Sequence, residues 1–284
     1  MKSSTRSQQF SIGNIRVGGE NSLFLIAGPC VIESPDHCQF MARRLKVITL
    51  RLQVPFIFKA SFDKANRTSL SSYRGPGMKE GLSILKSVRE DLGIPVLTDV
   101  HETGQIEPAA QSVDCLQIPA FLSRQTDLLL AAGKSGCAVN IKKGQFLAPW
   151  DMQHAVSKVA STGCQKILVT ERGTSFGYNN LVVDMRSLVL LRTLNVPVVY
   201  DVTHSLQLPG GQGTASGGQP QFIEPLARAG VAAGVDGLFM EVHDNPAAAL
   251  SDGPNALPLD RLEALLKQLV QINAIVQNDQ RPNH

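Results

Sequence analysis

The sequence predicts an α/β protein, a single (β/α)8 barrel, and two observations carry that prediction. Short apolar stretches recur along the 284-residue chain, and most are separated by segments long enough for a helix. Charged side chains directly follow these stretches, as they do at the carboxyl ends of the strands in parallel barrels. Alternating strands and helices build a parallel sheet, because its crossovers need a dozen or more residues. The predicted strands are 23–27, 55–60, 95–99, 115–118, 137–142, 167–171, 197–202 and 237–242.

The helices and the two chain ends complete this arrangement. Polar residues 1–9 are expected to form a flexible tail, and residues 10–17 a short β-hairpin that plugs the barrel bottom. Helices are predicted where apolar residues recur at three- and four-residue spacing, as in 38–50 and 78–92. The barrel domain therefore spans 10–277, and residues 278–284 form a second flexible tail. The last helix is the clearest, with one apolar stripe made of Leu262, Leu265, Leu266, Leu269 and Ile272.

Composition and charge exclude several classes of protein. Lysine and arginine total 27 and the acidic residues 24, so the net charge of +3 is too small for a nucleic-acid or membrane surface. The N-terminus lacks the apolar core of a signal peptide, and no apolar run approaches the roughly 18 residues of a membrane span. Five cysteines without a CxxC pair argue against a disulfide framework and a zinc finger. We therefore expect one cytoplasmic domain that binds neither nucleic acid nor membrane.

Basic side chains that follow predicted strands are expected to meet at the mouth of the barrel. Buried cations need anionic partners to offset their desolvation. A mixture of lysine and arginine suits a small molecule that carries both phosphate and carboxylate. The alternative is a set of structural ion pairs with Asp63, Asp99, Glu171 and Asp201. The basic residues are Lys59, Lys64, Lys142 and Arg172.

Two loops on the same rim add to this picture. Residues 205–220 follow His204 directly and hold five glycines between 210 and 218, which favours a lid over the site. A tolerated surface insertion has the same composition. Residues 66–69 and 73–77 form a polar loop of donors suited to a second phosphate, and ordinary loop solvation explains it almost as well.

Potential metal ligands also follow the first, seventh and eighth strands, which become neighbours when a barrel closes. Thiolate, imidazole and carboxylates together suit a borderline divalent ion such as zinc, iron or manganese. Taken singly, the cysteine also fits a small buried hydrophobe, the histidine a satisfied polar residue, and the aspartate a turn former. The candidates are Cys30, His204, Glu241 and Asp252.

Several longer strings resemble the 3-deoxy-D-manno-octulosonate 8-phosphate synthase family. The resemblance covers residues 12–276 and implies a TIM barrel that assembles as a homotetramer. It also implies an enzyme that condenses phosphoenolpyruvate with D-arabinose 5-phosphate and water. The products are the eight-carbon keto-sugar phosphate of lipopolysaccharide biosynthesis and inorganic phosphate. The strings that carry the resemblance are Phe58 to Arg67, Tyr73 to Gly77, Thr98 to Glu102, Gln117 to Asp127 and Asp201 to Gln207.

The family has metal-dependent and metal-independent members, and the resemblance places this chain in the first class. Cys30 stands where metal-independent members carry asparagine, and Ser251-Asp252 where they tend to carry Cys-Asp. The implied ligands of the zinc, iron or manganese ion are Cys30, His204, Glu241 and Asp252.

The resemblance also implies how the substrates are held. Phosphoenolpyruvate is assigned to Lys59, Ser61, Lys64, Lys142, Arg172 and Gln117. Arabinose 5-phosphate is assigned to Asn66, Arg67, Thr68, Asp99 and Phe121, with Arg124 reaching in from a neighbouring subunit. The implied catalytic residues are Lys59, Lys64, Lys142, Arg172, His204 and Asp252.

Two other functions remain open at this point. The related synthase that uses erythrose 4-phosphate shares the barrel, phosphoenolpyruvate and the metal. Its phosphate loop reads Lys-Pro-Arg-Thr, whereas the Lys-Ala-Asn-Arg-Thr of residues 64–68 favours the five-carbon sugar. The other alternative is a non-catalytic barrel that binds sugar phosphates.

Overall fold

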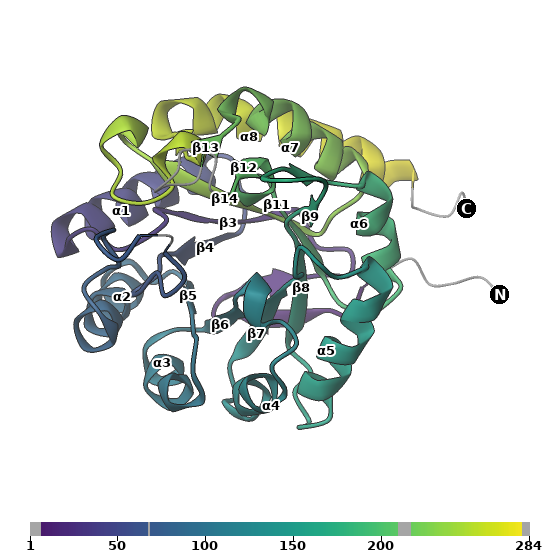
Figure 1. Cartoon of the computed structure of the whole chain (residues 1–284). Helices are drawn as coiled ribbons and strands as arrows, with labels where there is room; N and C mark the ends of the chain where they lie inside the picture. The colour runs from purple at the N-terminus through teal and green to yellow at the C-terminus, as the bar shows by residue number, and fades with distance from the viewer. Residues whose placement is uncertain (1–6, 68, 210–216, 280–284) are drawn as a thin grey trace.

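A closed parallel barrel forms the centre of the molecule. The computed structural model describes residues 7–67, 69–209 and 217–279, and the side chains among them up to residue 277. In these residues the parallel strands pair in the order β11-β8-β7-β6-β5-β4-β3-β14, and β14 also pairs with β11, which closes the sheet (Figure 1). The barrel strands are β3 (Phe24–Gly28), β4 (Phe56–Lys59), β5 (Val96–Asp99), β6 (Cys115–Ile118), β7 (Ala138–Lys142), β8 (Ile167–Glu171), β11 (Val198–Asp201) and β14 (Gly237–His243).

Helices surround the barrel in chain order, as Figure 1 shows. Local sequence fixes several helix ends. Helix α1 begins after Ser34, whose Oγ accepts a hydrogen bond from the His37 amide, and Pro35 occupies its first position. Helix α2 ends at Gly93, which adopts a φ of 59°. The helices are α1 (Pro35–Arg51), α2 (Met78–Leu92), α3 (Ile106–Ser112), α4 (Thr126–Lys134), α5 (Met152–Ala160), α6 (Met185–Arg192), α7 (Ile223–Ala232) and α8 (Leu259–Asp279).

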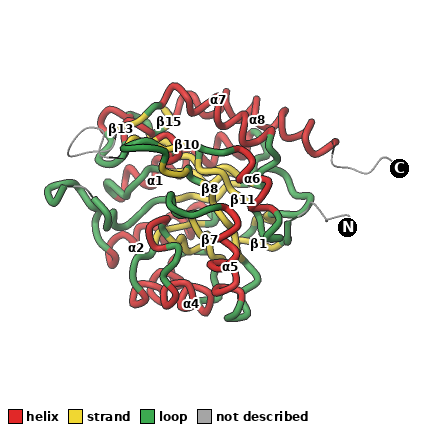
Figure 2. The backbone as a smooth tube through the Cα atoms, turned by 45° about the vertical axis from the view of Figure 1, so that its right-hand side comes forward, coloured by secondary structure: helices red, strands yellow, loops and turns green. Residues whose placement is uncertain are grey.

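The N-terminal hairpin closes one end of the barrel. Strands β1 (Phe10–Ile12) and β2 (Ile15–Val17) pair antiparallel around Gly13, which has a φ of 53°. Ile12 and Val17 are buried against the apolar residues at the start of the barrel strands. Figure 2 shows β1 on the side of the two chain termini, with β13 (Gly217–Gly218) and β15 (Leu257–Pro258) on the other side. The predicted hairpin is confirmed.

The interior of the barrel changes from apolar to polar along each strand. Successive inward-facing residues are two positions apart in a strand. At the hairpin end these residues form one apolar cluster, which includes Ile57, Leu97 and Phe239. Two positions later the same strands present Lys59, Asp99 and Glu241, all buried. The plugged end is therefore packed core, and the polar end holds the chemistry.

Most sequence predictions of the fold are confirmed, since each barrel strand lies within one residue of its predicted bounds. Ser7, predicted in the flexible tail, is buried and donates to Asp236 Oδ1 at 2.8 Å, so packing begins before the predicted domain start. The glycine-rich loop of residues 205–220 contains β12 (Gln207–Leu208), which pairs with β13, and its residues 210–216 lie outside the described part. No helix in the described ranges is long and apolar enough to cross a membrane.

Candidate active site

A cavity of about 600 Å³ opens at the polar end of the barrel. Ser61, Cys30 and Glu241 are buried and contact residues of its wall. Most of the residues singled out in the sequence line it directly: Lys59, Lys64, Asn66, Arg67, Asp99, Gln117, Phe121, Lys142, Arg172, His204 and Asp252.

Lys142, at the end of β7, is held by one carboxylate. Its Nζ donates to Asp201 Oδ2 at 2.6 Å and lies 3.9 Å from the centroid of the Phe239 ring. Burial lowers the pKa of Lys142, and the Asp201 charge offsets part of that effect. The predicted alternative of an ion pair is therefore present here. Because Lys142 also lines the cavity, an anion bound there would supply it with a second counter-charge.

Lys59 and Asp99 lie on neighbouring strands and form a second buried pair. Lys59 Nζ donates to the backbone oxygen of Cys30 at 2.9 Å and lies 4.0 Å from Asp99 Oδ2. Ser61 and Gln117 donate to the two carboxylate oxygens of Asp99. Burial raises the pKa of Asp99, but Lys59 and other lysines outweigh it and hold that pKa well below its usual range. Asp99 is therefore an ionised acceptor in the cavity wall.

A chain of hydrogen bonds joins four neighbouring strands at this level. It continues from Gln117, because Asn140 donates to Gln117 Oε1 at 2.9 Å and Thr170 donates to Asn140 Oδ1 at 2.6 Å. These inward-facing amides and hydroxyls satisfy one another in the barrel interior. Both ends of the Gln117 amide are therefore engaged by protein groups, which fixes its orientation toward the cavity.

Arg172, just after β8, presents a free donor. It is 5% exposed, its Nη2 donates to Gln207 Oε1 at 2.6 Å, and its buried Nη1 has no hydrogen-bond partner. Burial lowers the pKa of Arg172, and Asp201 and Asp252 counteract this effect. A guanidinium in the cavity wall with an unused N–H is suited to an anionic group of a substrate.

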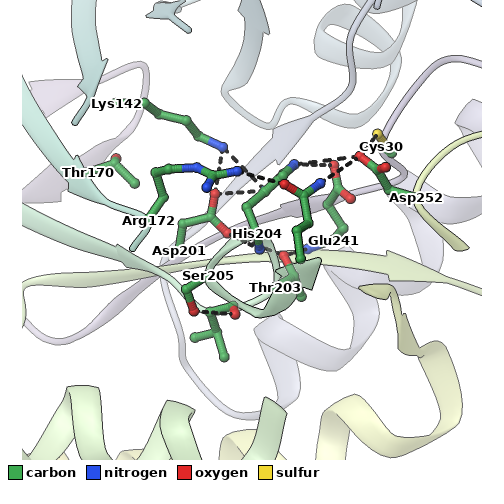
Figure 3. Close-up of polar contacts among 12 residues, drawn as sticks. Cys30, Lys142, Thr170, Arg172, Asp201, Thr203, His204, Ser205, Glu241 and Asp252 are labelled. Carbon is green, nitrogen blue, oxygen red and sulfur yellow. Dashed lines mark hydrogen bonds and ion pairs between the residues drawn. The ribbon is translucent and has the colours of Figure 1, made fainter. Parts of the chain in front are cut away.

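The four predicted metal ligands converge beside this wall (Figure 3). Cys30 Sγ lies 3.3 Å from Asp252 Oδ2. His204 Nε2 lies 3.2 Å from Glu241 Oε1 and 3.9 Å from Asp252 Oδ2. Cys30, Glu241 and Asp252 each offer a ligand atom within 4.8 Å of the others. Ligand atoms that share one ion at about 2.0–2.3 Å lie about 3–4 Å apart, so the spacing of Cys30, Glu241 and Asp252 is compatible with a single ion, and His204 lies next to two of these three residues.

Two further observations show that the residues fit a divalent cation. Both carboxylate oxygens of Glu241 are buried and make no hydrogen bond, and its charged neighbours His204 and Lys59 lie 3.2 Å and 3.8 Å from Oε1, so the carboxylate keeps unused acceptor capacity for a cation. His204 Nδ1 lies 2.7 Å from Asp201 Oδ2, so a neutral imidazole that donates from Nδ1 presents the lone pair of its Nε2 to Glu241 and Asp252. A carboxylate behind a histidine is the usual support of a metal-binding imidazole.

In the absence of a metal ion, the pKa values of Cys30 and Glu241 are shifted in opposite directions. Burial raises the pKa of the Cys30 thiol well above its ordinary value, and the neighbouring Glu241 charge adds to the rise. A coordinated thiol loses its proton, so a cation reverses this preference. Burial also raises the pKa of Glu241, but the charges of His204 and Lys59 hold it well below its usual range.

Comparison with known proteins identifies the family. The model that describes the DAHP synthetase I family matches residues 3–278. This chain belongs to the DAHP synthetase I family. Proteins named 2-dehydro-3-deoxyphosphooctonate aldolase from Trichlorobacter lovleyi and Geobacter metallireducens are 60% and 58% identical over 270 residues, 95% of this chain and 99% of each relative. A protein of the same name from Geotalea uraniireducens is 60% identical over 269 residues, again 95% of this chain and 99% of the relative.

Three residues that the family resemblance assigned to the sugar phosphate need separate comment. Thr68 lies outside the described residues. Arg67 lines the cavity and donates to Ser251 Oγ at 2.9 Å and to the Leu250 backbone oxygen at 3.2 Å. Arg124 is exposed and is not among the described residues that line the cavity, so a role in substrate binding requires a second subunit.

The sequence analysis named several further residues of the site without assigning them a role in it. Asp201 was considered only as an ion-pair partner, yet it holds both Lys142 and His204. Gln207 joins Arg172 to Asp252, to which its Nε2 donates at 3.2 Å. Ser251 lies 3.1 Å from Cys30 Sγ through its Oγ. Each lies within three positions of a predicted site residue, His204 or Asp252, and that proximity in sequence was the available signal.

Proposed function

We propose that this chain condenses phosphoenolpyruvate with D-arabinose 5-phosphate and water, giving 3-deoxy-D-manno-octulosonate 8-phosphate and inorganic phosphate. The observation that carries the proposal is a cavity whose wall combines buried cations, a free arginine donor and a potential metal site. Its relatives are named for a dehydro-deoxy-phosphooctonate, an acid of eight carbons. Phosphoenolpyruvate contributes three of these carbons and the pentose phosphate five.

Phosphoenolpyruvate is assigned to the cationic part of the cavity. Lys142 and Arg172 offer an ammonium group and a free guanidinium N–H to its phosphate and carboxylate. Lys59 and Lys64, which line the same cavity, add positive charge, and Gln117 and Ser61 hold Asp99 in place. This arrangement fixes the methylene carbon of the enol phosphate toward the second substrate.

The sugar phosphate is assigned to the outer part of the cavity. Asn66, Arg67 and Thr68 would bind its phosphate, while Asp99 and Phe121 would contact the sugar. The aldehyde carbon then forms a bond with the methylene carbon of phosphoenolpyruvate, and its oxygen takes up a proton. Water adds to the second carbon of phosphoenolpyruvate, whose phosphate leaves, so that the carbonyl group of the keto acid forms. The cavity holds all three reactants in one orientation and limits direct hydrolysis.

The proposed metal ligands are Cys30, His204, Glu241 and Asp252. When bound, a divalent ion of the zinc, iron or manganese type polarises an oxygen of a reactant or lowers the pKa of a coordinated water. The protein's own contribution is orientation, because Asp201 fixes the imidazole of His204 and Gln207 donates to Asp252. A homotetramer in which Arg124 reaches a neighbouring cavity, and a cytoplasmic location, remain predictions.

The nearest alternative is the same chemistry with erythrose 4-phosphate, which gives a seven-carbon product. The family description covers that reaction by name, whereas the eight-carbon name of the relatives favours arabinose 5-phosphate. The decisive experiment measures phosphate release from phosphoenolpyruvate when purified protein is offered either sugar, with and without a chelator. Release with arabinose 5-phosphate supports the proposal, and faster release with erythrose 4-phosphate contradicts it. Binding of both ligands without release identifies a non-catalytic barrel.

A further inference from the structure

A second cluster of potential metal ligands lies outside the cavity described above. Glu33 follows β3, His37 lies in the first turn of α1, and His243 and Asp244 lie at the end of β14, the strand that pairs with β3. Glu33, His37 and His243 each offer a ligand atom within 4.8 Å of the others. None of the four residues is among those that line the active-site cavity in the described chain.

One carboxylate lies beside both imidazoles. Asp244 Oδ1 lies 2.9 Å from His37 Nε2 and 3.2 Å from His243 Nδ1. An imidazole that donates one ring N–H to a carboxylate presents a lone pair on its other nitrogen. Those other nitrogens are turned toward Glu33, since His243 Nε2 lies 3.2 Å from Glu33 Oε1 and His37 Nδ1 lies 3.9 Å from Glu33 Oε2.

Hydrogen bonding within this cluster does not account for one nitrogen of His37. His37 Nδ1 is buried from solvent and has no hydrogen-bond partner. The side chain as a whole is 17% exposed, so a small ion can reach the cluster from solvent. His243 Nδ1 accepts a hydrogen bond from the Asn245 amide at 3.0 Å. An ion on Nε2 would require the other tautomer, in which Nδ1 donates to Asp244 Oδ1, 3.2 Å away.

We propose that Glu33, His37 and His243 form a second site for a divalent transition-metal ion of the zinc class, supported by Asp244. Two imidazoles and one carboxylate are an established ligand set for such an ion and leave a position for water. The site lacks a thiolate, which distinguishes it chemically from the cluster around Cys30.

The position of the site gives it a role in holding the loop that carries Asp252. Glu33 Oε1 accepts a hydrogen bond from the Leu250 amide at 2.8 Å. The next residue, Ser251, contacts Cys30 Sγ at 3.1 Å and also accepts from Arg67. An ion on Glu33 therefore fixes the carboxylate that anchors residues 250–252 against the active-site wall.

Cobalt(II) titration of metal-stripped, full-length protein tests the proposal. Cobalt bound to the Cys30 thiolate produces a sulfur-to-metal charge-transfer band, whereas cobalt at the second site, which has only nitrogen and oxygen ligands, does not. Total bound cobalt is measured in parallel by elemental analysis after dialysis. The variants are His37→Ala, the more conservative His37→Gln, and a control, His154→Ala, which removes an exposed histidine of α5.

The expected result is two cobalt ions per subunit in the wild type and in His154→Ala. Both His37 variants are expected to lose one equivalent while they keep the charge-transfer band. Two bound ions in either folded His37 variant, or a wild type that binds a single ion with the thiolate band, would overturn the second site. A wild-type protein that binds cobalt without the charge-transfer band would contradict the assignment of Cys30 as a ligand. The second site would then be judged by whether the His37 variants bind one cobalt ion fewer than the wild type.

Discussion

Asp201 is the residue on which two parts of the proposed site depend, so Asp201→Asn is the most informative single change. Asp201 is fully buried and accepts from Lys142 Nζ at 2.6 Å, and its Oδ2 lies 2.7 Å from His204 Nδ1. Burial raises the pKa of Asp201, but the charges of His204 and Lys142 outweigh it and keep that pKa well below its usual range. Asparagine has the same shape, but it replaces an ionised acceptor with a neutral one.

The expected loss follows from these two contacts. Hydrogen bonds to charged groups contribute about 1.5–3 kcal/mol and neutral ones about 0.5–1.5 kcal/mol, so each contact loses roughly 1–1.5 kcal/mol. Two contacts together lose roughly 2–3 kcal/mol, which corresponds to roughly a 30- to 150-fold fall in kcat/KM for phosphoenolpyruvate. The assay is phosphate release at varied phosphoenolpyruvate and saturating arabinose 5-phosphate, with metal content measured on the same preparation.

The matched control is Asp184→Asn, which changes the same functional group at the surface. Asp184 caps α6 and pairs with Arg186 at 2.9 Å, with half of its side chain exposed. Exposed pairs contribute about 0–1 kcal/mol, and asparagine is an equally good helix cap, so activity should stay within about fivefold of wild type. A folded Asp201→Asn enzyme with wild-type kcat/KM would refute the reasoning that Asp201 supports Lys142 and His204.

Four further predictions follow from other parts of the molecule. Arg67→Ala should weaken use of arabinose 5-phosphate by roughly 10- to 150-fold, the cost of a charge-assisted hydrogen bond, with little change in the KM for phosphoenolpyruvate. Cys30→Ala should lose bound metal and activity together, as measured by elemental analysis and phosphate release, because the thiolate is a proposed ligand. Mixed Arg124→Ala and Lys142→Ala subunits should recover activity that neither variant has alone, since a hybrid pair contains one intact shared site. Ile12→Ala should lower the free energy of unfolding in urea by about 2–5 kcal/mol through the cavity it leaves in the barrel plug, with kcat preserved.

Each of these predictions has a result that contradicts it. Equal losses for both substrates in Arg67→Ala would remove the proposed division of the cavity. Full activity in metal-free wild type would return Cys30 to the role of a small buried hydrophobe. Absence of complementation, after subunit exchange is demonstrated, would count against a shared site. An unchanged urea midpoint in Ile12→Ala would mean that the hairpin is not part of the folded core.

A variant at the metal cluster separates two roles of the ion. Cys30→Asn introduces the residue that the family resemblance assigns to metal-independent members at this position. Turnover that persists after the metal is lost would assign the ion to positioning reactants. Complete loss of turnover would assign it a chemical role, or show that residues such as Glu241 remain dependent on an ion.

The barrel was predictable from the sequence because its strands are buried on both faces and therefore form continuous apolar runs. The same runs end in residues such as Lys59, Asp99 and Glu241, so the polar end of the barrel could also be inferred. The hairpin was predictable from its turn at Gly13, where a positive φ is required. Burial of Ser7 was not, since its partner Asp236 is 229 positions away along the chain.

Less of the site than of the fold could be predicted from the sequence, because the hydrogen-bond and ion-pair partners in the site are set by three-dimensional contact. Sequence placed Cys30 and Asp252 after neighbouring strands, but it did not show that Asp252 also accepts from Gln207. It could not show that Asp201 orients His204, because one carboxylate can serve as an ion-pair partner or as a support for a ligand. The second metal cluster was missed for the same reason, since Glu33 and His243 are 210 positions apart.

The most direct test of the proposed function is to identify the product. Purified protein with divalent metal is incubated with phosphoenolpyruvate and either arabinose 5-phosphate or erythrose 4-phosphate, and the products are analysed by mass spectrometry. The account predicts an eight-carbon keto-acid phosphate from arabinose 5-phosphate, formed in equal amount with inorganic phosphate and abolished by a chelator. A seven-carbon product as the main outcome, or no new carbon–carbon bond with either sugar, would contradict it.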